Sequence, residues 1–191
     1  MSHLSTTLRI EAPAAAVFDV IADPARSPEW QTLLAEMGDI AGRPGGIGSS
    51  FMGFYRVAGR RLAGRFVVTA SERPRILQVN GTTSGGWARW TTMIEPVGSG
   101  CVVEVRLEYE LPGEIVGSLF GLLTGSRIER EFRRTYANLK QLVETEAGTA
   151  SASESAAAPL PAPADEAPRA SAPSHTSGDE ASEPGGRLAA S

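Results

Sequence analysis

The chain has 191 residues and a formal net charge of −4. Residues 1–146 carry sixteen basic and sixteen acidic residues, whereas residues 147–191 carry two arginines and six acids, so the net charge comes from the C-terminal part. This balance argues against nucleic acid as the main partner, because phosphate binding needs a clustered basic surface. The single cysteine, Cys101, excludes an internal disulfide and a cysteine-rich metal cluster.

Composition divides the chain near residue 146. All the aromatic residues lie between Phe18 and Tyr136, and residues 147–191 are rich in Ala, Ser, Pro, Gly and Glu. Such a segment buries too little apolar surface to offset the entropy lost on ordering. We therefore expect one folded domain over residues 1–146 and a disordered acidic tail over residues 147–191.

The N-terminus and the hydropathy of the chain indicate where the protein resides. The first residues lack the basic region and apolar core of a signal peptide. No apolar run approaches the roughly 20 residues that span a bilayer. We expect a cytoplasmic protein with no stable membrane insertion.

In chain order, the patterns begin with a strand and two short helices. Residues 6–11 alternate between apolar and polar side chains, which is typical of a half-buried strand. Pro13 then suits the first position of a helix that ends at Asp23-Pro24. Ser27 as N-cap, followed by Pro28, predicts a second short helix.

Six further strands are predicted, over residues 34–40, 49–57, 61–70, 75–83, 87–96 and 101–111. The last has the clearest alternation, with Val103, Val105 and Leu107 on one face and charged residues on the other. The short connections favour antiparallel neighbours. The sequence leaves open which face of strands 49–57 and 75–83 points inward.

A long C-terminal helix is predicted over residues 112–146. Its second half carries an apolar stripe at helical spacing, formed by Ile128, Phe132, Tyr136, Leu139 and Val143. Its first half is apolar nearly all round, and a glycine recurs there every fourth residue from 117 to 125. This half suits close packing on the sheet, room for a ligand, or both.

Several of these segments resemble the START-like (SRPBCC) superfamily over about residues 4–146. The matching motifs are Ile10-x-Ala12-Pro13, Val17-Phe18, Ile21-x-Asp23-Pro24, Pro28-Glu29-Trp30, Trp90-x-x-x-Ile94-Glu95-Pro96 and Tyr109-x-Leu111-Pro112-Gly113 before the long helix. Bacterial members are often labelled polyketide cyclase/dehydrase or lipid-transport proteins. The resemblance implies an α+β helix-grip (Bet v 1-like) fold, in which a curved antiparallel sheet of about seven strands holds a long C-terminal helix across it. It also implies a cavity between the sheet and that helix, which binds an apolar or amphipathic molecule.

The residue types present limit the possible chemistry. The two histidines are His3, at the expected frayed start, and His175, in the tail, so we expect no Ser–His–Asp triad, no Cys–His pair and no histidine metal site. No carboxylate pair has a spacing that indicates general acid–base catalysis. No cofactor and no metal are expected.

Two functions remain for the cavity, and whether the protein is an enzyme stays open. The first is the binding of a lipid- or polyketide-like small molecule by a group of mainly aromatic and aliphatic residues: Trp30, Phe51, Tyr55, Phe66, Trp90, Tyr109, Leu119, Leu123 and Arg127. The alternative is a polyketide cyclase/aromatase-like enzyme that moves protons with Tyr55, Tyr109 and Arg127. A third possibility is an interaction module, in which the helix face or the acidic tail docks a protein partner. Trp87 and Arg89 fall on the opposite strand face from Trp90, where they can stack with each other. Protein partners, oligomeric state and the role of the tail are left open.

Overall fold

Seven antiparallel strands form one curved sheet in the computed structural model, which describes residues 2–57, 60–83, 86–110 and 125–156. The strand order is β1-β7-β6-β5-β4-β3-β2. The strands are β1 (Ser2–Ile10), β2 (Leu34–Ala41), β3 (Ser50–Val57), β4 (Arg60–Glu72), β5 (Ile76–Thr83), β6 (Gly86–Val97) and β7 (Gly100–Glu110). Each strand from β2 to β6 pairs with the next strand along the chain, and β1 pairs with β7.

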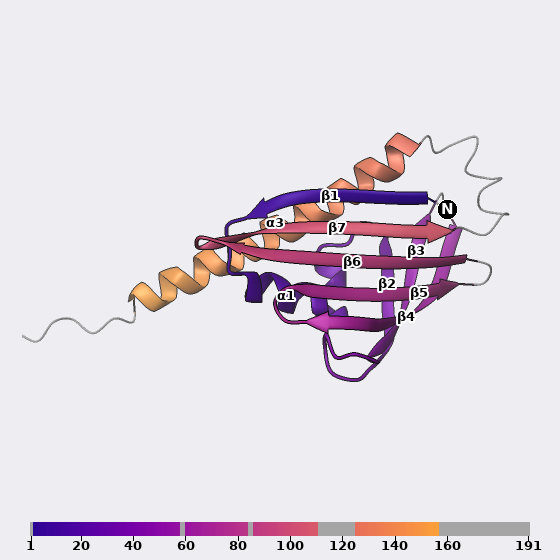
Figure 1. Cartoon of the computed structure of the whole chain (residues 1–191), viewed down its shortest axis with the longest axis horizontal. Coiled ribbons are helices and arrows are strands. Elements are labelled where there is room, and N and C mark those ends of the chain that lie inside the picture. Colours follow the sequence, from indigo (N-terminus) through magenta and orange to yellow (C-terminus); the bar gives the residue numbers. More distant parts are fainter. Residues whose placement is uncertain (1, 58–59, 84–85, 111–124, 157–191) are drawn as a thin grey trace, which may run out of the picture. The chain divides into compact units, whose positions relative to one another are not determined.

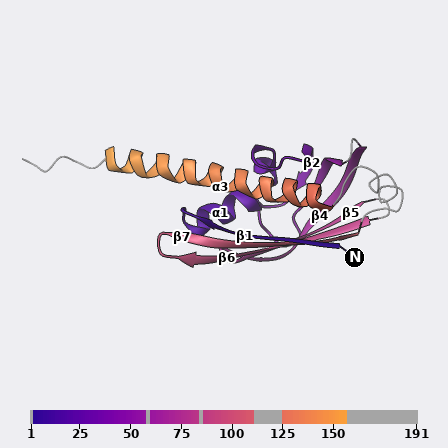
Figure 2. The same ribbon diagram turned by 90° about the horizontal axis from the view of Figure 1, so that it is seen from above.

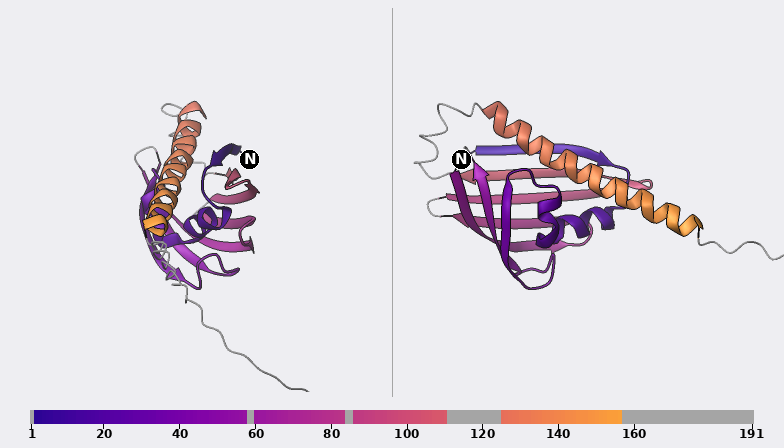
Figure 3. Two further views of the ribbon diagram at one scale, coloured as in Figure 1. Left: turned by 90° about the vertical axis from the view of Figure 1, so that its left-hand side faces the viewer. Right: turned by 180° about the vertical axis from the view of Figure 1, so that it is seen from behind.

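The helices lie on one face of this sheet (Figures 1 and 2). α1 (Ala14–Ala22) and the short 3₁₀ helix η1 (Pro24–Glu29) connect β1 to β2, the two edge strands. α3 (Gly125–Ala156) runs obliquely across the same face, as seen from behind in Figure 3. The predicted α+β helix-grip architecture with seven strands is therefore confirmed.

The second short helix begins earlier than predicted. Asp23 caps it, with its side-chain oxygen accepting the Ala25 N–H at 2.9 Å, and Pro24 occupies its first turn. Ser27, expected as the N-cap, is instead buried inside this helix. The prediction was wrong because Asp23-Pro24 serves two purposes: it ends α1 and, as an acidic cap followed by proline, begins η1.

Two other boundaries also differ from the prediction. β1 begins at Ser2, so His3 lies within a strand paired with β7 and is not part of a frayed end. α3 continues to Ala156, so residues 147–156, assigned to the disordered tail, are helical. The first half of the predicted helix, residues 112–124, and the remaining tail lie outside the described residues.

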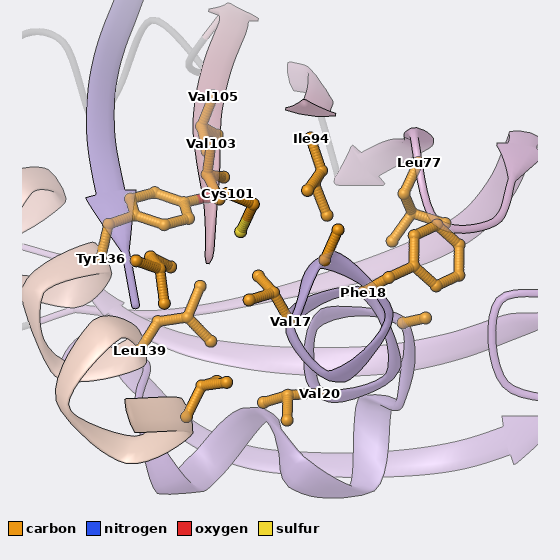
Figure 4. Close-up of a cluster of buried hydrophobic side chains, with 14 of the residues drawn as sticks. Val17, Phe18, Val20, Leu77, Ile94, Cys101, Val103, Val105, Tyr136 and Leu139 are labelled. Atoms are coloured by element: carbon orange, nitrogen blue, oxygen red, sulfur yellow. The ribbon is translucent and has the colours of Figure 1, made fainter. Parts of the chain in front are cut away.

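A hydrophobic core fills the space between α1, the sheet and the middle of α3 (Figure 4). Leu139 and Val143 from the predicted stripe of α3 are 0% and 1% exposed. They pack in one cluster with Val17 of α1 and with Val103 and Val105 of β7. From Phe132 onward the stripe thus buries its apolar face as its spacing predicts, while the side chain of Ile128 lies outside the described residues.

The structure also shows which faces of β3 and β5 point inward, a question that the sequence left open. Phe51 and Tyr55 of β3 share the inner face, and so do Leu77 and Val79 of β5. Phe54 lies on the outer face of β3, where the guanidinium of Arg61 sits 4.2 Å from its ring centroid. The inner face of β3 is therefore its more aromatic face, and the inner face of β5 is aliphatic.

Candidate functional site: an aromatic cavity between sheet and helix

A cavity of about 260 Å³ opens between the inner face of the sheet, η1 and α3. The chain contains three tryptophans and three tyrosines, and all six line this cavity: Trp30, Trp87, Trp90, Tyr55, Tyr109 and Tyr136. Protein interiors normally leave few voids larger than a water molecule. A space of this size, lined by rings that also carry a polar atom, differs from an ordinary core.

One wall of the cavity is an aromatic group on the sheet, which we call the sheet cluster (Phe51, Tyr55, Phe66 and Trp90). Phe66 is its centre and is 4% exposed. Its ring stacks on Phe51 at a centroid distance of 5.2 Å and meets Tyr55 and Trp90 edge-on at 5.7 and 5.6 Å. These are favourable aromatic geometries, so the cluster forms a stiff apolar surface.

Phe66 can lie close to the sheet because three glycines surround it. Gly53, Gly64 and Gly81 come from three adjacent strands, and the register places Gly53 opposite Gly64 and Phe66 opposite Gly81. A Cβ atom built on Gly81 would lie 2.5 Å from Cδ1 of Phe66, and one on Gly53 would lie 2.9 Å from its Cε2. The missing side chains therefore provide the space in which this ring lies.

The facing wall is a second aromatic group, the helix cluster (Trp30, Phe132 and Tyr136). Trp30 and Tyr136 lie 5.7 Å apart by ring centroid, and Phe132 meets Tyr136 edge-on at 5.0 Å. Trp30 follows η1, and its backbone carbonyl accepts a bond from the Asn138 side chain at 3.4 Å. This bond ties the end of η1 to α3 and holds the cluster in place.

Hydrogen-bonding groups gather at the helix cluster. The hydroxyl of Tyr55 donates to Oε1 of Gln31 at 3.4 Å, reaching across from the sheet. The indole nitrogen of Trp30 is buried and has no hydrogen-bond partner among the described residues. An unpaired buried donor costs about 1–3 kcal/mol, and this nitrogen is enclosed by the packing around it.

Burial also affects the ionisation of the two tyrosines on this side of the cavity, Tyr55 and Tyr136. It raises the pKa of Tyr55 above its usual value, and it does the same for Tyr136, whose pKa is raised further by the nearby Tyr55. Both hydroxyls therefore stay protonated at neutral pH. They can donate hydrogen bonds but cannot act as bases there.

At the other end of the cavity, Trp87 and Glu110 sit opposite each other in the register of β6 and β7. The indole N–H of Trp87 donates to the Glu110 carboxylate at 3.1 Å. The predicted stacking of Trp87 on Arg89 is not what the structure shows, since Arg89 contacts Asn80 at 3.2 Å and Glu108 at 3.6 Å. The alternation along β6 places the Trp87 side chain on the outer face of the sheet. It still lines the cavity, because Trp87 lies at the end of the strand.

Six of the nine residues that the sequence nominated line the cavity: Trp30, Phe51, Tyr55, Phe66, Trp90 and Tyr109. Leu119 and Leu123 lie outside the described residues, and the side chain of Arg127 is also outside them. The sequence did not nominate Gln31, Phe132, Tyr136 or the three glycines. Phe132 and Tyr136 belong to the predicted stripe, but the stripe alone does not reveal which turn faces an open space.

The described residues provide no obvious metal centre. Their His, Cys, Asp and Glu side chains form no group of three that could hold an ion. Among the same residues, Glu110 is the one carboxylate lining the cavity, and no lysine or arginine lines it. None of the helices described combines the length and the apolar character needed to cross a bilayer.

Comparison with known proteins shows that the chain matches the model of one protein family. The family model described as "Polyketide cyclase / dehydrase and lipid transport" matches residues 1–144. No match was found among curated protein sequences.

Solved structures resemble the fold over most of their length. The protein TTHA0849 from Thermus thermophilus is 16% identical, with a TM-score of 0.64 over 76% of this chain and 99% of that one. A START superfamily protein from Mycobacterium smegmatis is 16% identical, with a TM-score of 0.55 over 78% and 98%. Ara h 8.0201 is 12% identical, with a TM-score of 0.53 over 75% and 98%.

Proposed function

The chain belongs to the polyketide cyclase/dehydrase and lipid transport family, and we propose that it binds an apolar or amphipathic small molecule in the cavity between the sheet and α3. The observation that carries this proposal is the position of all the tryptophans and tyrosines around one cavity. Ligand pockets are typically apolar and aromatic, with a few placed polar groups. The lining fits that description.

The size of the cavity favours a compact ligand. Its volume of about 260 Å³ lies just below the range of about 300–1,000 Å³ that is typical of ligand sites. Aromatic walls on two sides favour a ring system over a flexible chain, because offset and edge-on ring contacts add to the apolar burial. We therefore expect a ligand of one or two rings.

Binding can be tested by titrating the full chain with tetralin, a neutral two-ring hydrocarbon. Because every tryptophan lines the cavity, intrinsic tryptophan fluorescence reports on its occupancy. We expect a saturable change in emission. Ala88→Phe, which adds a ring inside the cavity, should weaken binding at least about tenfold, since it removes the space that the probe needs.

Ala63→Phe is the matched control, because Ala63 is exposed on the outer face of β4 and receives the same ring. It should leave the affinity unchanged within about twofold. A titration that never saturates, or equal effects of the two variants, would contradict the proposal. Comparing native and denatured masses of gently purified protein would also reveal a co-purified ligand.

A polyketide cyclase-like enzyme is the second candidate, favoured by one observation. Tyr55 and Tyr109, the tyrosines nominated as proton-transfer groups, both line the cavity, and burial keeps the Tyr55 hydroxyl protonated, so that it can donate a hydrogen bond to a substrate oxygen. In this case a model poly-β-ketone would be converted by the wild type, and the rate would fall in Tyr55→Phe. Turnover that survives both Tyr55→Phe and Tyr109→Phe would remove these assignments.

A further inference from the structure

Three arginines gather on the outer face of the sheet, on the neighbouring strands β3 and β4; we call them the arginine patch. Arg56, Arg61 and Arg65 are all exposed, and Arg56 lies directly opposite Arg61 in the strand register. Like charges at directly opposite positions of a strand pair repel each other. An anionic partner placed over this pair would relieve the repulsion, because each guanidinium would then gain an opposite charge.

The contacts of the arginine patch leave its side chains exposed to solvent. Arg61 pairs with Glu36, and the two side chains are 57% and 60% exposed. Arg65 donates to the hydroxyl of Ser50 at 3.0 Å, which is an uncharged partner. Together the three arginines and this glutamate carry two positive charges. An exposed ion pair contributes little to stability, so an external anion can compete with Glu36 for Arg61 at a small cost.

Apolar side chains lie among these arginines. The ring of Phe54 is on the same outer face, with the guanidinium of Arg61 at 4.2 Å from its centroid. Met52 lies opposite Arg65 in the register. Both apolar residues are only half-buried. Surfaces that combine arginine with aromatic and aliphatic groups suit the boundary of a bilayer, where lipid phosphates lie next to the acyl chains.

The strand segments that carry the arginine patch also form part of the cavity. Tyr55 and Leu62 are a directly opposite pair on the inner face, and both line the cavity. They are the sequence neighbours of Arg56 and Arg61, which point outward because side chains alternate along a strand. An apolar ligand concentrates in lipid rather than in water. Contact between this patch and a membrane would therefore bring the cavity close to a source of ligand.

We propose that the arginine patch docks the protein reversibly on a membrane that contains anionic lipid, with the guanidinium groups contacting lipid phosphates. The electrostatic part of the proposal stands on the patch alone. The choice of a membrane among anionic partners rests in part on the proposed function, because the apolar ligand would be taken up from the lipid. Docking of this kind is weak and falls as ionic strength rises, because it depends on a few exposed charges.

The test measures co-sedimentation of the full chain with vesicles at low ionic strength. One set of vesicles contains phosphatidylglycerol and phosphatidylcholine in equal parts, and the other contains phosphatidylcholine alone. We expect binding to the anionic vesicles only, and loss of this binding at high ionic strength. A variant with both Arg56→Gln and Arg61→Gln should bind about 10- to 30-fold more weakly, since each arginine near an anionic surface contributes about fivefold to the affinity.

The matched control is a variant with both Arg89→Gln and Arg106→Gln. These arginines lie on the outer face of β6 and β7, their side chains are 46% and 61% exposed, and their removal changes the net charge equally. This variant should bind within about twofold of the wild type, because its two arginines lie outside the patch.

A second readout keeps all the arginines. The one native cysteine, Cys101, is buried, so a fluorophore such as NBD can be attached selectively after Ala63→Cys, between Arg61 and Arg65 on β4. Anionic vesicles should shift its emission to shorter wavelength, because the dye enters a less polar environment. The same dye attached after Ser99→Cys, in the turn between β6 and β7, should shift less.

The outcomes separate docking from ligand binding, because the tetralin titration contains no lipid. Docking is overturned if the wild type does not bind anionic vesicles, or if the two double variants lose the same affinity. It is also overturned if inorganic phosphate or duplex DNA at the same ionic strength displaces the protein from the vesicles, since the patch would then be a phosphate or nucleic-acid site. Vesicle binding without saturable tetralin binding would remove the proposed function and leave the docking surface.

Discussion

Substitution of Gly81 by alanine tests how the sheet wall of the cavity is built. The new Cβ would lie 2.5 Å from Cδ1 of Phe66 and closer still to its Cε1. Ordinary carbon contacts are about 3.5–4.0 Å, so the ring must move by about 1 Å or more. Phe51 is stacked on Phe66 at a centroid distance of 5.2 Å, so this movement also displaces the rest of the sheet cluster.

Overpacking of this kind costs about 1–3 kcal/mol. We expect Gly81→Ala to lower the free energy of unfolding by that amount in urea, with the midpoint shifted and the slope unchanged. The displaced ring should also narrow the cavity and weaken tetralin. Gly38→Ala is the matched control, because no heavy atom lies within 4 Å of a Cβ at that position.

A double-mutant cycle decides whether Phe66 is the cause. When Phe66→Ala removes the ring, the cost of Gly81→Ala should fall below about 0.5 kcal/mol, because the two residues are in contact and their effects are coupled. If Gly81→Ala costs the same with and without the ring, the reasoning about the glycines around Phe66 is refuted. A stable Gly81→Ala protein with unchanged affinity would refute it as well.

Three further expectations follow from the core, the tail and the buried tyrosines. Leu139→Ala should lower the free energy of unfolding by about 2–5 kcal/mol, measured in urea, because Leu139 is fully buried; a cost below about 1 kcal/mol would contradict the packing of α3. Removal of residues 157–191 should change the thermal midpoint by less than about 2 °C; a larger drop would show that the tail packs on the domain. Because the pKa values of Tyr55 and Tyr136 are raised in the folded state, the contribution of these two tyrosines to stability should be constant below pH ~10 and fall above it, by up to about 1.4 kcal/mol per pH unit for each tyrosine. Unfolding in urea at several alkaline pH values measures this slope, and Tyr136→Phe should reduce it.

The fold was predictable because apolar residues recur in its strands and helices at the regular spacing of each kind of element. In β7 the alternation of valines with charged residues places Val103 and Val105 in the core, where both are 0% exposed. The stripe of α3 predicted Leu139 and Val143 in the same way. The helix η1 was misplaced because Asp23-Pro24 is equally good at ending one helix and capping the next.

The candidate site was predictable only in part, because much of it depends on sheet register. Alternation alone placed Trp90 and Tyr109 on the inner face. It could not reveal that Gly53, Gly64 and Gly81 meet around one ring, since that follows from how three strands pair. A glycine inside each of three successive strands was nevertheless a usable signal, because strand glycines often mark a close approach.

The helix α3 combines two roles that are separated along its length. Phe132 and Tyr136 lie in the core cluster and also line the cavity, whereas Leu139 and Val143, further along, belong to the core alone. Bonds such as Lys140 to the Arg9 carbonyl, at 2.6 Å, fix the later turns to β1. These contacts hold the helix in place through residues that do not line the cavity. Its earlier turn can therefore form a less tightly packed wall of the cavity while the fold is retained. This arrangement explains how one apolar stripe can both stabilise the domain and leave a space for a ligand.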